Sequence, residues 1–269
     1  MLYASKDARQ TRQLVDNLSR NINASGGYDW VDLLDAMKQP HDDDNYVVSR
    51  AVVDLAIGSA RVHQQLLQRI TEIGFLHSAE PSTPTISAGQ FAAWFERTRR
   101  NEVEPLLKEH GRELRVGNYE GCADETRIRW DGEAMADIVR ELVINALKYS
   151  REGAPVGVEY QFETAGPHPF CAVRVRNQPR PSQARNADGQ PIVGIPDEYS
   201  QRVFELFYTI DSFPTALEGE KWTDGTGLYF VRALAEKMGG WADTHSGVDY
   251  SEGDPQPQVV LEVRLPIAP

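Results

Sequence analysis

Apolar residues along the first part of the chain follow a helical repeat. We predict a polar amphipathic helix over residues 5–22 and a longer one over about residues 46–76, because apolar side chains recur there every three or four positions. The seam of the longer helix is formed by Val48, Val52, Leu55, Ser59, Val62, Leu66, Ile70 and Ile73. A seam of this kind is what a two-helix hairpin or a dimeric four-helix bundle requires.

Beyond Pro81 and Pro84 the pattern changes from helical to mixed. One more helix is predicted over about residues 88–110, and after Gly111 short runs of alternating apolar and polar residues predict strands. The strands cover residues 113–116, 127–130, 156–162, 172–176 and 259–265, and two helices cover residues 132–149 and 228–238. Because these elements interleave without a strict βαβ rhythm, we predict an α+β fold. A helical hairpin or bundle is followed by a two-layer α/β sandwich, with helices on one face of a mixed sheet.

The same change of pattern predicts two domains, which the length of 269 residues can accommodate. Residues 1–85 would form a helical domain for dimerisation, and residues 86–269 a mixed domain, with the boundary near residues 78–90. A homodimer is therefore expected.

Charge and composition restrict the partners. The net charge is −12 and the pI about 5.0, which argues against nucleic acid or an anionic membrane, because both would repel this surface. No apolar run reaches the roughly 18 residues of a membrane span, and the N-terminus lacks an apolar signal core. Cys122 and Cys171 show neither CxxC nor metal-ligand spacing. We expect a cytoplasmic chain without a membrane span.

Candidate chemistry begins on the helix over residues 132–149. Glu141, Asn145 and Lys148 stand at i, i+4 and i+7, so they share one helix face. An amide oxygen suits Mg²⁺, an ammonium group meets phosphate, and a carboxylate can orient or activate water. The face could therefore serve a metal–triphosphate. The alternative is an ordinary solvated face with a charge pair.

Two glycine-containing loops and an aromatic segment add to this face. Gly194 and Ile195 follow a strand that ends at Asn177, and a glycine there lets the backbone approach a flat ligand. Residues 223–227 form a glycine-rich loop that opens a helix, whose free N–H groups suit phosphate. Residues 203–209 read as an aromatic helix end. Taken singly, the first loop is an ordinary turn and the aromatic segment ordinary core.

In this order and spacing, the four segments resemble the N, G1, F and G2 boxes of the histidine kinase-like ATPases. The runs ELVINALKYS, GIPDEYSQRVFELFYT and GTGLYFVRALAEKMGG are similar to those of sensor histidine kinases in particular. GGWADTHSG followed by VVLEVRLP resembles the closing hairpin of the same domain. The resemblance covers about residues 113–266.

The resemblance implies an ATP site with Mg²⁺. Asn145 would hold the metal, Glu141 would assist the metal or the transfer geometry, and Asn177 would accept a hydrogen bond from adenine. The remaining nucleotide contacts would come from Lys148, Tyr149, Gly194, Ile195, Phe207, Gly225, Thr226, Gly227 and Leu228. A mobile lid would span about residues 211–222. Phosphoryl transfer requires mainly positioning and charge neutralisation, which such groups supply.

Two departures from the family pattern matter, and the first concerns the base. The family usually has Asp where this chain has Asn177, and a neutral acceptor is worth roughly 1 kcal/mol against about 1.5–3 for a charged one. We therefore predict weakened, not abolished, adenine recognition. An insertion over residues 179–193 also separates this position from Gly194, and Thr223 replaces the first glycine of the G2 box.

The phosphoacceptor is the other departure. In the best match to the acceptor motif, residues 18–23, Arg20 stands where a histidine would, and arginine is no nucleophile. His63 is the remaining candidate, while His41 and His77 are expected to be ordinary surface residues. The leading hypothesis is a dimeric kinase that transfers the γ-phosphate of ATP to a histidine and controls a response regulator. The alternatives are a degenerate binding module that docks a partner kinase or regulator, and a serine kinase of the anti-sigma type.

Overall fold

The computed structural model describes Arg50, Thr71 and residues 84–117, 123, 125–186, 188–210, 225–251 and 253–268. The chain forms two compact units: residues 1–79 with 212–225, and residues 80–211 with 226–269. The second unit holds nearly all described residues and is the one whose fold follows. Apart from Arg50 and Thr71, the predicted N-terminal hairpin, with His41, His63 and His77, lies outside the described residues.

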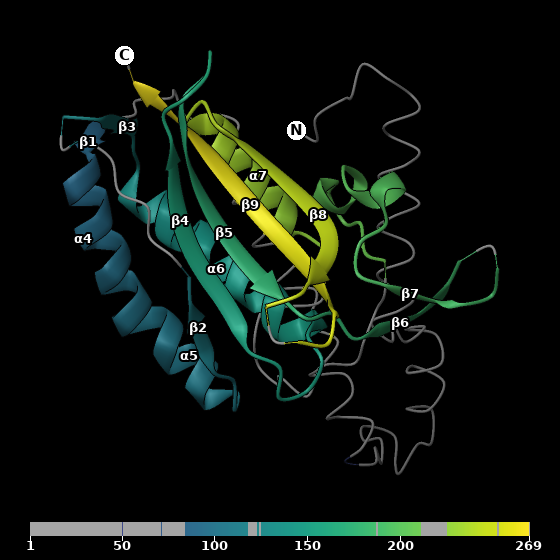
Figure 1. Ribbon diagram of the computed structural model, residues 1–269. Helices are drawn as coiled ribbons and strands as arrows, with labels where there is room; N and C mark the ends of the chain where they lie inside the picture. The colour runs from purple at the N-terminus through teal and green to yellow at the C-terminus, as the bar shows by residue number, and fades with distance from the viewer. Residues whose placement is uncertain are drawn as a thin grey trace, which may run out of the picture. The chain divides into compact units, whose positions relative to one another are not determined.

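A seven-stranded mixed sheet is the centre of the second unit (Figure 1). Its strands follow the order β1 (Thr85–Ser87), β3 (Arg127–Arg129), β9 (Gln256–Ala268), β5 (Phe170–Asn177), β4 (Val156–Glu163) and β2 (Leu114–Val116), while β8 (Trp241–Asp249) also pairs with β9. The β2–β4 pair is parallel and the other pairs of this sheet are antiparallel. The predicted mixed sheet is therefore confirmed.

Helices cover one face of this sheet (Figure 1). They are α6 (Gly132–Tyr149), α7 (Gly227–Lys237) and a third helix made of α4 (Ala88–Thr98), a π-helical turn (Arg99–Val103) and α5 (Glu104–Glu109). Local signals start two of them. Asp131 caps α6 by accepting from the N–H groups of Glu133 and Ala134, and Ser87 forms a capping box with Gln90 at the start of α4.

The core lies between the sheet and the helices. In β4 every second residue is buried, as expected for a strand with one face toward helices. Phe91 of α4 is fully buried, and its ring makes edge contacts with Trp130, Tyr160 and Phe162 at centroid distances of 5.2–5.9 Å. These contacts fix the third helix to the β4 side of the sheet, in the second unit.

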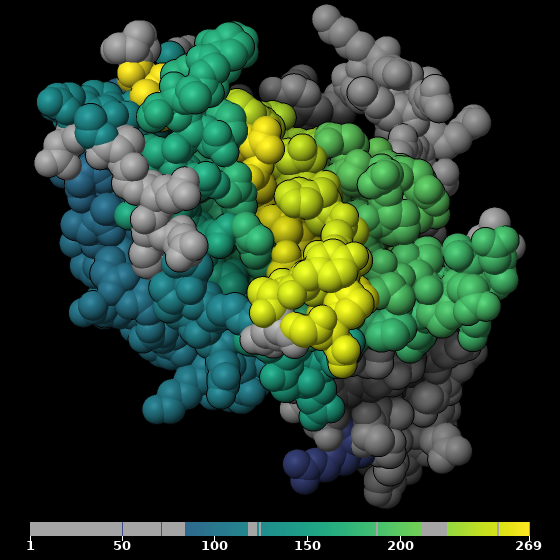
Figure 2. Space-filling view, in the orientation of Figure 1, coloured from purple at the N-terminus to yellow at the C-terminus, as the bar shows by residue number. Residues whose placement is uncertain are grey.

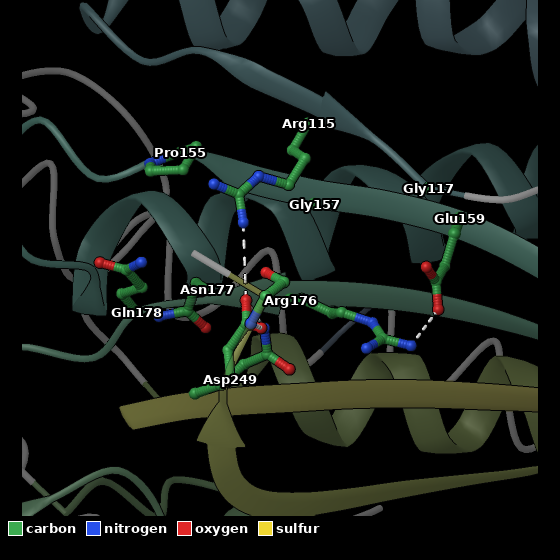
Figure 3. A pocket seen from close by; sticks show the side chains of 11 residues that line it. Arg115, Gly117, Pro155, Gly157, Glu159, Arg176, Asn177, Gln178 and Asp249 are labelled. Carbon is green, nitrogen blue, oxygen red and sulfur yellow. Dashed lines mark hydrogen bonds and ion pairs between the residues drawn. The ribbon is translucent and has the colours of Figure 1, made fainter. Parts of the chain in front are cut away.

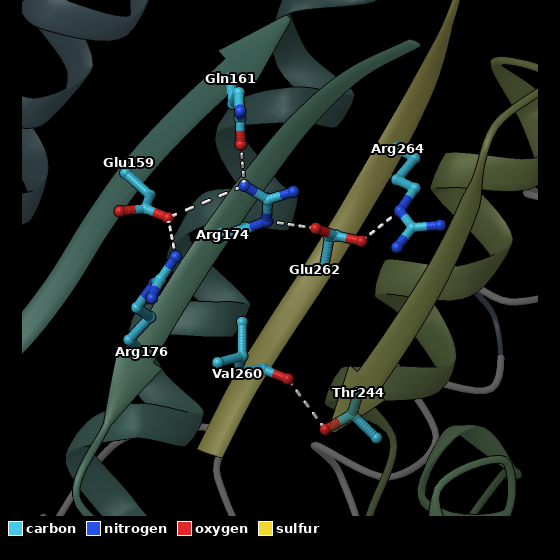
Figure 4. A network of polar contacts seen from close by, with 8 residues as sticks. All are labelled: Glu159, Gln161, Arg174, Arg176, Thr244, Val260, Glu262 and Arg264. Carbon is cyan, nitrogen blue, oxygen red and sulfur yellow. Dashed lines mark hydrogen bonds and ion pairs between the residues drawn. The ribbon is translucent and has the colours of Figure 1, made fainter. Parts of the chain in front are cut away.

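The other face of the sheet carries a network of charged side chains (Figure 4). Glu262 of β9 is only 2% exposed and pairs with Arg174 of β5 and Arg264 of its own strand. Arg174 also donates to Gln161 at 2.6 Å, and Arg176 pairs with Glu159. The space-filling view shows residues of β4, β5, β8 and β9 at the surface on this side (Figure 2). No helix among the described residues has the length and apolarity to cross a membrane.

The inserted segment and the aromatic segment differ from expectation. The insertion after Asn177 forms a hairpin of β6 (Pro181–Arg185) and β7 (Pro191–Val193), which was not predicted. The aromatic segment contains one 3-10 turn, Arg202–Phe204, and no helix end. The reason lies in the backbone: Phe207 has φ of 61°, a left-handed value that ends any right-handed helix. Its side chain and those of Phe204 and Tyr208 are buried.

Candidate functional site

The polar face of α6 forms one wall of the candidate site. Glu141, Asn145, Lys148 and Tyr149 are half-buried, whereas the opposite face is buried at Leu142, Val143, Ala146 and Leu147. This division follows the helical spacing. It places Glu141, Asn145 and Lys148 on the face of α6 that points away from the core. The Lys148 ammonium lies 5.9 Å from the centroid of the Tyr149 ring.

A hydrogen bond orients the Asn145 amide. Its Nδ2 donates to the main-chain carbonyl oxygen of Glu141 at 2.8 Å, one helical turn back. With the nitrogen held against the helix, the amide oxygen is directed to the other side. A hard oxygen in this position suits Mg²⁺, which prefers oxygen ligands and retains several waters. Among the described residues, no group of three or more His, Cys, Asp or Glu side chains could hold a metal.

The first turn of α7 lies directly against this face. A Cβ atom added to Gly227 would stand 2.6 Å from Glu141 Oε2 and 3.5 Å from Asn145 Nδ2, so a glycine is what permits the approach. Thr226, the N-cap, is 1% exposed, and Leu228 is half-buried. The structure therefore brings Glu141, Asn145 and Gly227 together at a helix N-terminus, where free N–H groups and the helix dipole favour an anion.

Gly225 is the last residue of the first unit and has φ of 66°. Its positive φ is the conformation that glycine adopts without strain. The predicted lid, residues 211–222, lies outside the described residues.

The end of β5 is tied to the end of α6. Arg151 donates its main-chain N–H to Gln178 O at 2.8 Å, and Arg180 donates to Tyr149 O at 2.9 Å. These bonds flank a bridge between Ser150 and Pro179. Asn177, the last residue of β5, is thereby held beside the C-terminal turn of α6.

Asn177 is a buried amide with an unmet hydrogen bond. It is 5% exposed, and its Nδ2 has no partner among the described residues. An unpaired buried donor costs about 1–3 kcal/mol, so such groups are rare in native proteins and often mark a ligand or a water site. Across the sheet, Asn177 pairs in register with Val259, and Val259 with Ser246.

The Gly194–Ile195 loop rests on this row. Gly194 has φ of 78°, and an added Cβ would lie 2.8 Å from Ser246 Oγ and 3.3 Å from Val259 Cγ2. Ile195 donates its main-chain N–H to Ser246 Oγ at 2.8 Å, and that hydroxyl donates to Ile195 O at 2.9 Å. Ser246 was not among the predicted site residues. Its position in the closing hairpin carries no local signal, because its role depends on a loop far away in the sequence.

Phe207 and its aromatic neighbours are buried. The Arg232 guanidinium of α7 lies 4.6 Å from the Phe204 ring centroid, and that of Arg202 lies 4.7 Å from the Tyr208 ring. The contact between Arg232 and Phe204 links the aromatic segment to α7. Phe207 itself is 4% exposed, which agrees with the core interpretation of this segment.

A separate hollow of about 220 Å³ lies on the charged face of the sheet (Figure 3). Arg115 there pairs with Asp249 at 3.5 Å, and Arg176 pairs with Glu159. The Ser251 N–H bonded to Asp249, helped by the Ser251 side chain and Arg115, lowers the pKa of that carboxyl. Because its arginines face carboxylates, the hollow presents a balanced surface. Of the predicted site residues, only Asn177 borders it.

Three helices on one face of a mixed sheet, with a half-buried Glu/Asn/Lys helix face opposite a glycine-opened helix, define the class of histidine kinase-like ATP-binding domains. A family model described as "Histidine kinase-, DNA gyrase B-, and HSP90-like ATPase" matches residues 130–268. The chain belongs to this family.

Two solved structures, those of ShkA and of the histidine kinase ThkA, share the fold. Full-length ShkA in complex with AMPPNP is 16% identical with a TM-score of 0.53, covering 97% of this chain and 46% of that one. ThkA in complex with the response regulator TrrA is 14% identical with a TM-score of 0.54, covering 97% and 62%. A mycobacterial sensor histidine kinase, MprB, is 18% identical with a TM-score of 0.46, covering 70% and 99%. This chain thus spans less than two thirds of the ShkA and ThkA chains. A search of curated proteins finds no matching sequence.

Proposed function

We propose that this chain binds Mg–ATP between α6 and the start of α7 and transfers the γ-phosphate to a histidine in two-component signalling. Family membership supports the nucleotide, and the solved ShkA structure of similar fold contains AMPPNP. The observation that carries the proposal is the contact of Gly227 with Glu141 and Asn145, because it joins an anion-binding helix end to a metal ligand and a carboxylate.

Each group has a task that its chemistry allows. The Asn145 amide oxygen would hold Mg²⁺, and the α7 N-terminus would receive the triphosphate. Lys148 would neutralise phosphate charge, and Glu141 would orient the metal or the attacking group. At the other end, Asn177 and the Gly194–Ile195 loop would hold the base. Phosphoryl transfer depends on this kind of positioning and charge neutralisation.

Radiolabel transfer tests the reaction. The purified chain is incubated with Mg²⁺ and γ-labelled ATP, and the label on protein is treated with acid and with base. Transfer to histidine gives an acid-labile, base-stable label, and His63→Gln should remove it if that residue is the acceptor. A label that persists in His63→Gln would exclude His63, and no label on any histidine would contradict the kinase reaction.

The partners would be a second copy of the chain and a response regulator. The predicted helical seam of residues 46–76 supports a homodimer, and ThkA of similar fold was solved with its regulator TrrA. Sedimentation equilibrium of the whole chain tests the dimer.

Arg20 favours a second candidate, a binding module that docks a kinase or regulator without transferring phosphate. Arginine replaces histidine in the best match to the acceptor motif, and a neutral amide occupies the position that would face adenine. Calorimetric titration separates the two candidates: absence of ATP binding at millimolar nucleotide favours the binding module.

A further inference from the structure

We infer that Asn177 makes the base subsite accept 6-oxopurine nucleoside triphosphates as well as ATP. The inference rests on the proposed nucleotide function of this site and adds which purine bases the site accepts. It starts from one observation: a side chain 95% removed from solvent whose amide nitrogen is buried without a hydrogen-bond partner among the described residues.

Asn177 lies at the end of the site that suits a base. Ser150, the C-cap of α6, is five positions after Asn145, which at 1.5 Å per residue is roughly 7 Å along the helix axis. The phosphate end therefore lies at Asn145 and Gly227, and Asn177 lies beyond the last turn, against the segment after Ser150. Opposite it in the sheet is the buried Val259, and the Gly194 backbone lies next to Val259, an apolar surface that suits a flat ring.

An amide can satisfy two kinds of purine edge. Adenine offers a donor at the 6-amino group next to an acceptor at N1, while guanine and hypoxanthine offer an acceptor at the 6-oxo group next to a donor at N1. The Asn side chain carries one acceptor oxygen and two donor hydrogens, and its terminal torsion has a two-fold preference, so a half-turn exchanges them. Asn177 can therefore pair with either edge of a purine held in one orientation. A carboxylate has no hydrogen for a 6-oxo group.

The experiment compares ATP with inosine triphosphate, which differs from ATP only at N1 and the 6-position. Dissociation constants of both are measured calorimetrically with Mg²⁺ on the whole chain. For the unchanged chain we expect the two constants to agree within about tenfold, because both edges are fully paired. In Asn177→Asp, the ratio of the inosine triphosphate constant to the ATP constant should rise by at least about tenfold.

Asn145→Asp is the matched control, with the same chemical change at the metal end. It should weaken both nucleotides equally and leave their ratio unchanged. If the unchanged chain binds ATP but holds inosine triphosphate more than about tenfold less tightly, the inference is overturned while the proposed ATP site stands. If neither nucleotide binds, the proposed function itself fails. Should Asn177→Asp not fold, the ratio in the unchanged chain alone decides.

Discussion

Asparagine occurs twice in the candidate site, and its surroundings give it a different task at each position. At Asn145 the amide nitrogen is used by the helix, which leaves the oxygen for a cation. At Asn177 the nitrogen is buried and unused, which leaves a donor for a ligand. The residue type alone could not separate these tasks; the hydrogen-bond partners do.

Asn145→Asp should lower Mg–ATP affinity at least about tenfold, or roughly 1.4 kcal/mol. A carboxylate cannot donate to the Glu141 carbonyl, so the orienting bond is lost and a second negative charge is placed beside Glu141. Calorimetry measures the affinity, and an unchanged melting temperature shows that the fold is intact. Unaltered binding in this variant would refute the metal role.

Gly227→Ala separates the effect of the Gly227–Glu141 contact on nucleotide binding from its effect on the stability of the fold. The added methyl meets the end of the Glu141 side chain at 2.6 Å, and a long side chain can rotate away. We therefore expect thermal stability to change by less than about 1 kcal/mol, since alanine also favours helix. Nucleotide affinity should fall, because Glu141 leaves its position.

Gly240→Ala is the control for that variant. Its methyl would meet the main-chain oxygen of Arg264, which cannot move aside, so it should destabilise the fold by about 1–3 kcal/mol. Urea denaturation measures the free energy of unfolding of both variants. Full nucleotide affinity in a folded Gly227→Ala chain would contradict the assigned contact.

Among the elements, α6 and the start of α7 carry one end of the candidate site, and the end of β5 and a short loop carry the other. α6 begins directly after its N-cap residue Asp131, and its last turn is hydrogen-bonded to the segment after β5. The Gly194–Ile195 loop has no regular structure of its own and depends on Ser246 of β8. One hydroxyl therefore sets the position of the base-side loop.

Ser246→Ala should release that loop. Two hydrogen bonds are lost, each worth about 0.5–1.5 kcal/mol, and hydrogen exchange at the Ile195 amide should accelerate. Nucleotide affinity should weaken with little change in global unfolding. Ser200→Ala, which removes a local turn bond to Asp197 O, is the matched control and should leave Ile195 exchange unaltered. Equal exchange rates in the Ser246→Ala and unchanged chains would refute the tether.

For the mixed unit as a whole, stability depends on the charges on the open face of the sheet remaining paired. Glu262 is buried between Arg174 and Arg264, and Arg264 also lies over the Phe170 and Trp241 rings at 4.9 and 5.4 Å. A buried ion pair adds little net stability when intact, but removal of one partner leaves an unmatched charge.

Glu262→Ala should therefore lower the free energy of unfolding by about 3 kcal/mol. Glu262→Gln keeps the shape and one acceptor and should lose less. Arg115→Ala, which removes a half-exposed pair with Asp249, should cost under about 1 kcal/mol. Urea denaturation of the three variants gives the order of their free energies of unfolding. A loss of unfolding free energy in Glu262→Ala no larger than that in Arg115→Ala would contradict the account.

Local patterns were sufficient for the elements and for the family. The helix at Gly132–Tyr149 was predicted at its observed bounds, because its apolar repeat and its Asp131 cap are neighbours in the chain. The five predicted strands match β2, β3, β4, β5 and β9 within a few residues. The short β1 and the β6–β7 hairpin were missed, since runs rich in proline, serine and asparagine show no alternation of apolar residues. β8 was not among the predicted strands either, and only the family resemblance implied it, as part of a closing hairpin.

Contacts between distant residues could not be read in the same way. Strand register places Asn177, Val259 and Ser246 in one row, and a shift of one strand by a single residue would turn its member of the row to the other face. The unmet amide of Asn177 and the approach of Gly227 to Glu141 likewise exist only after packing. Residue order thus specified which chemical groups this protein has and the elements that carry them. The folded arrangement specified which of those groups meet, because register and packing join positions that no local pattern relates.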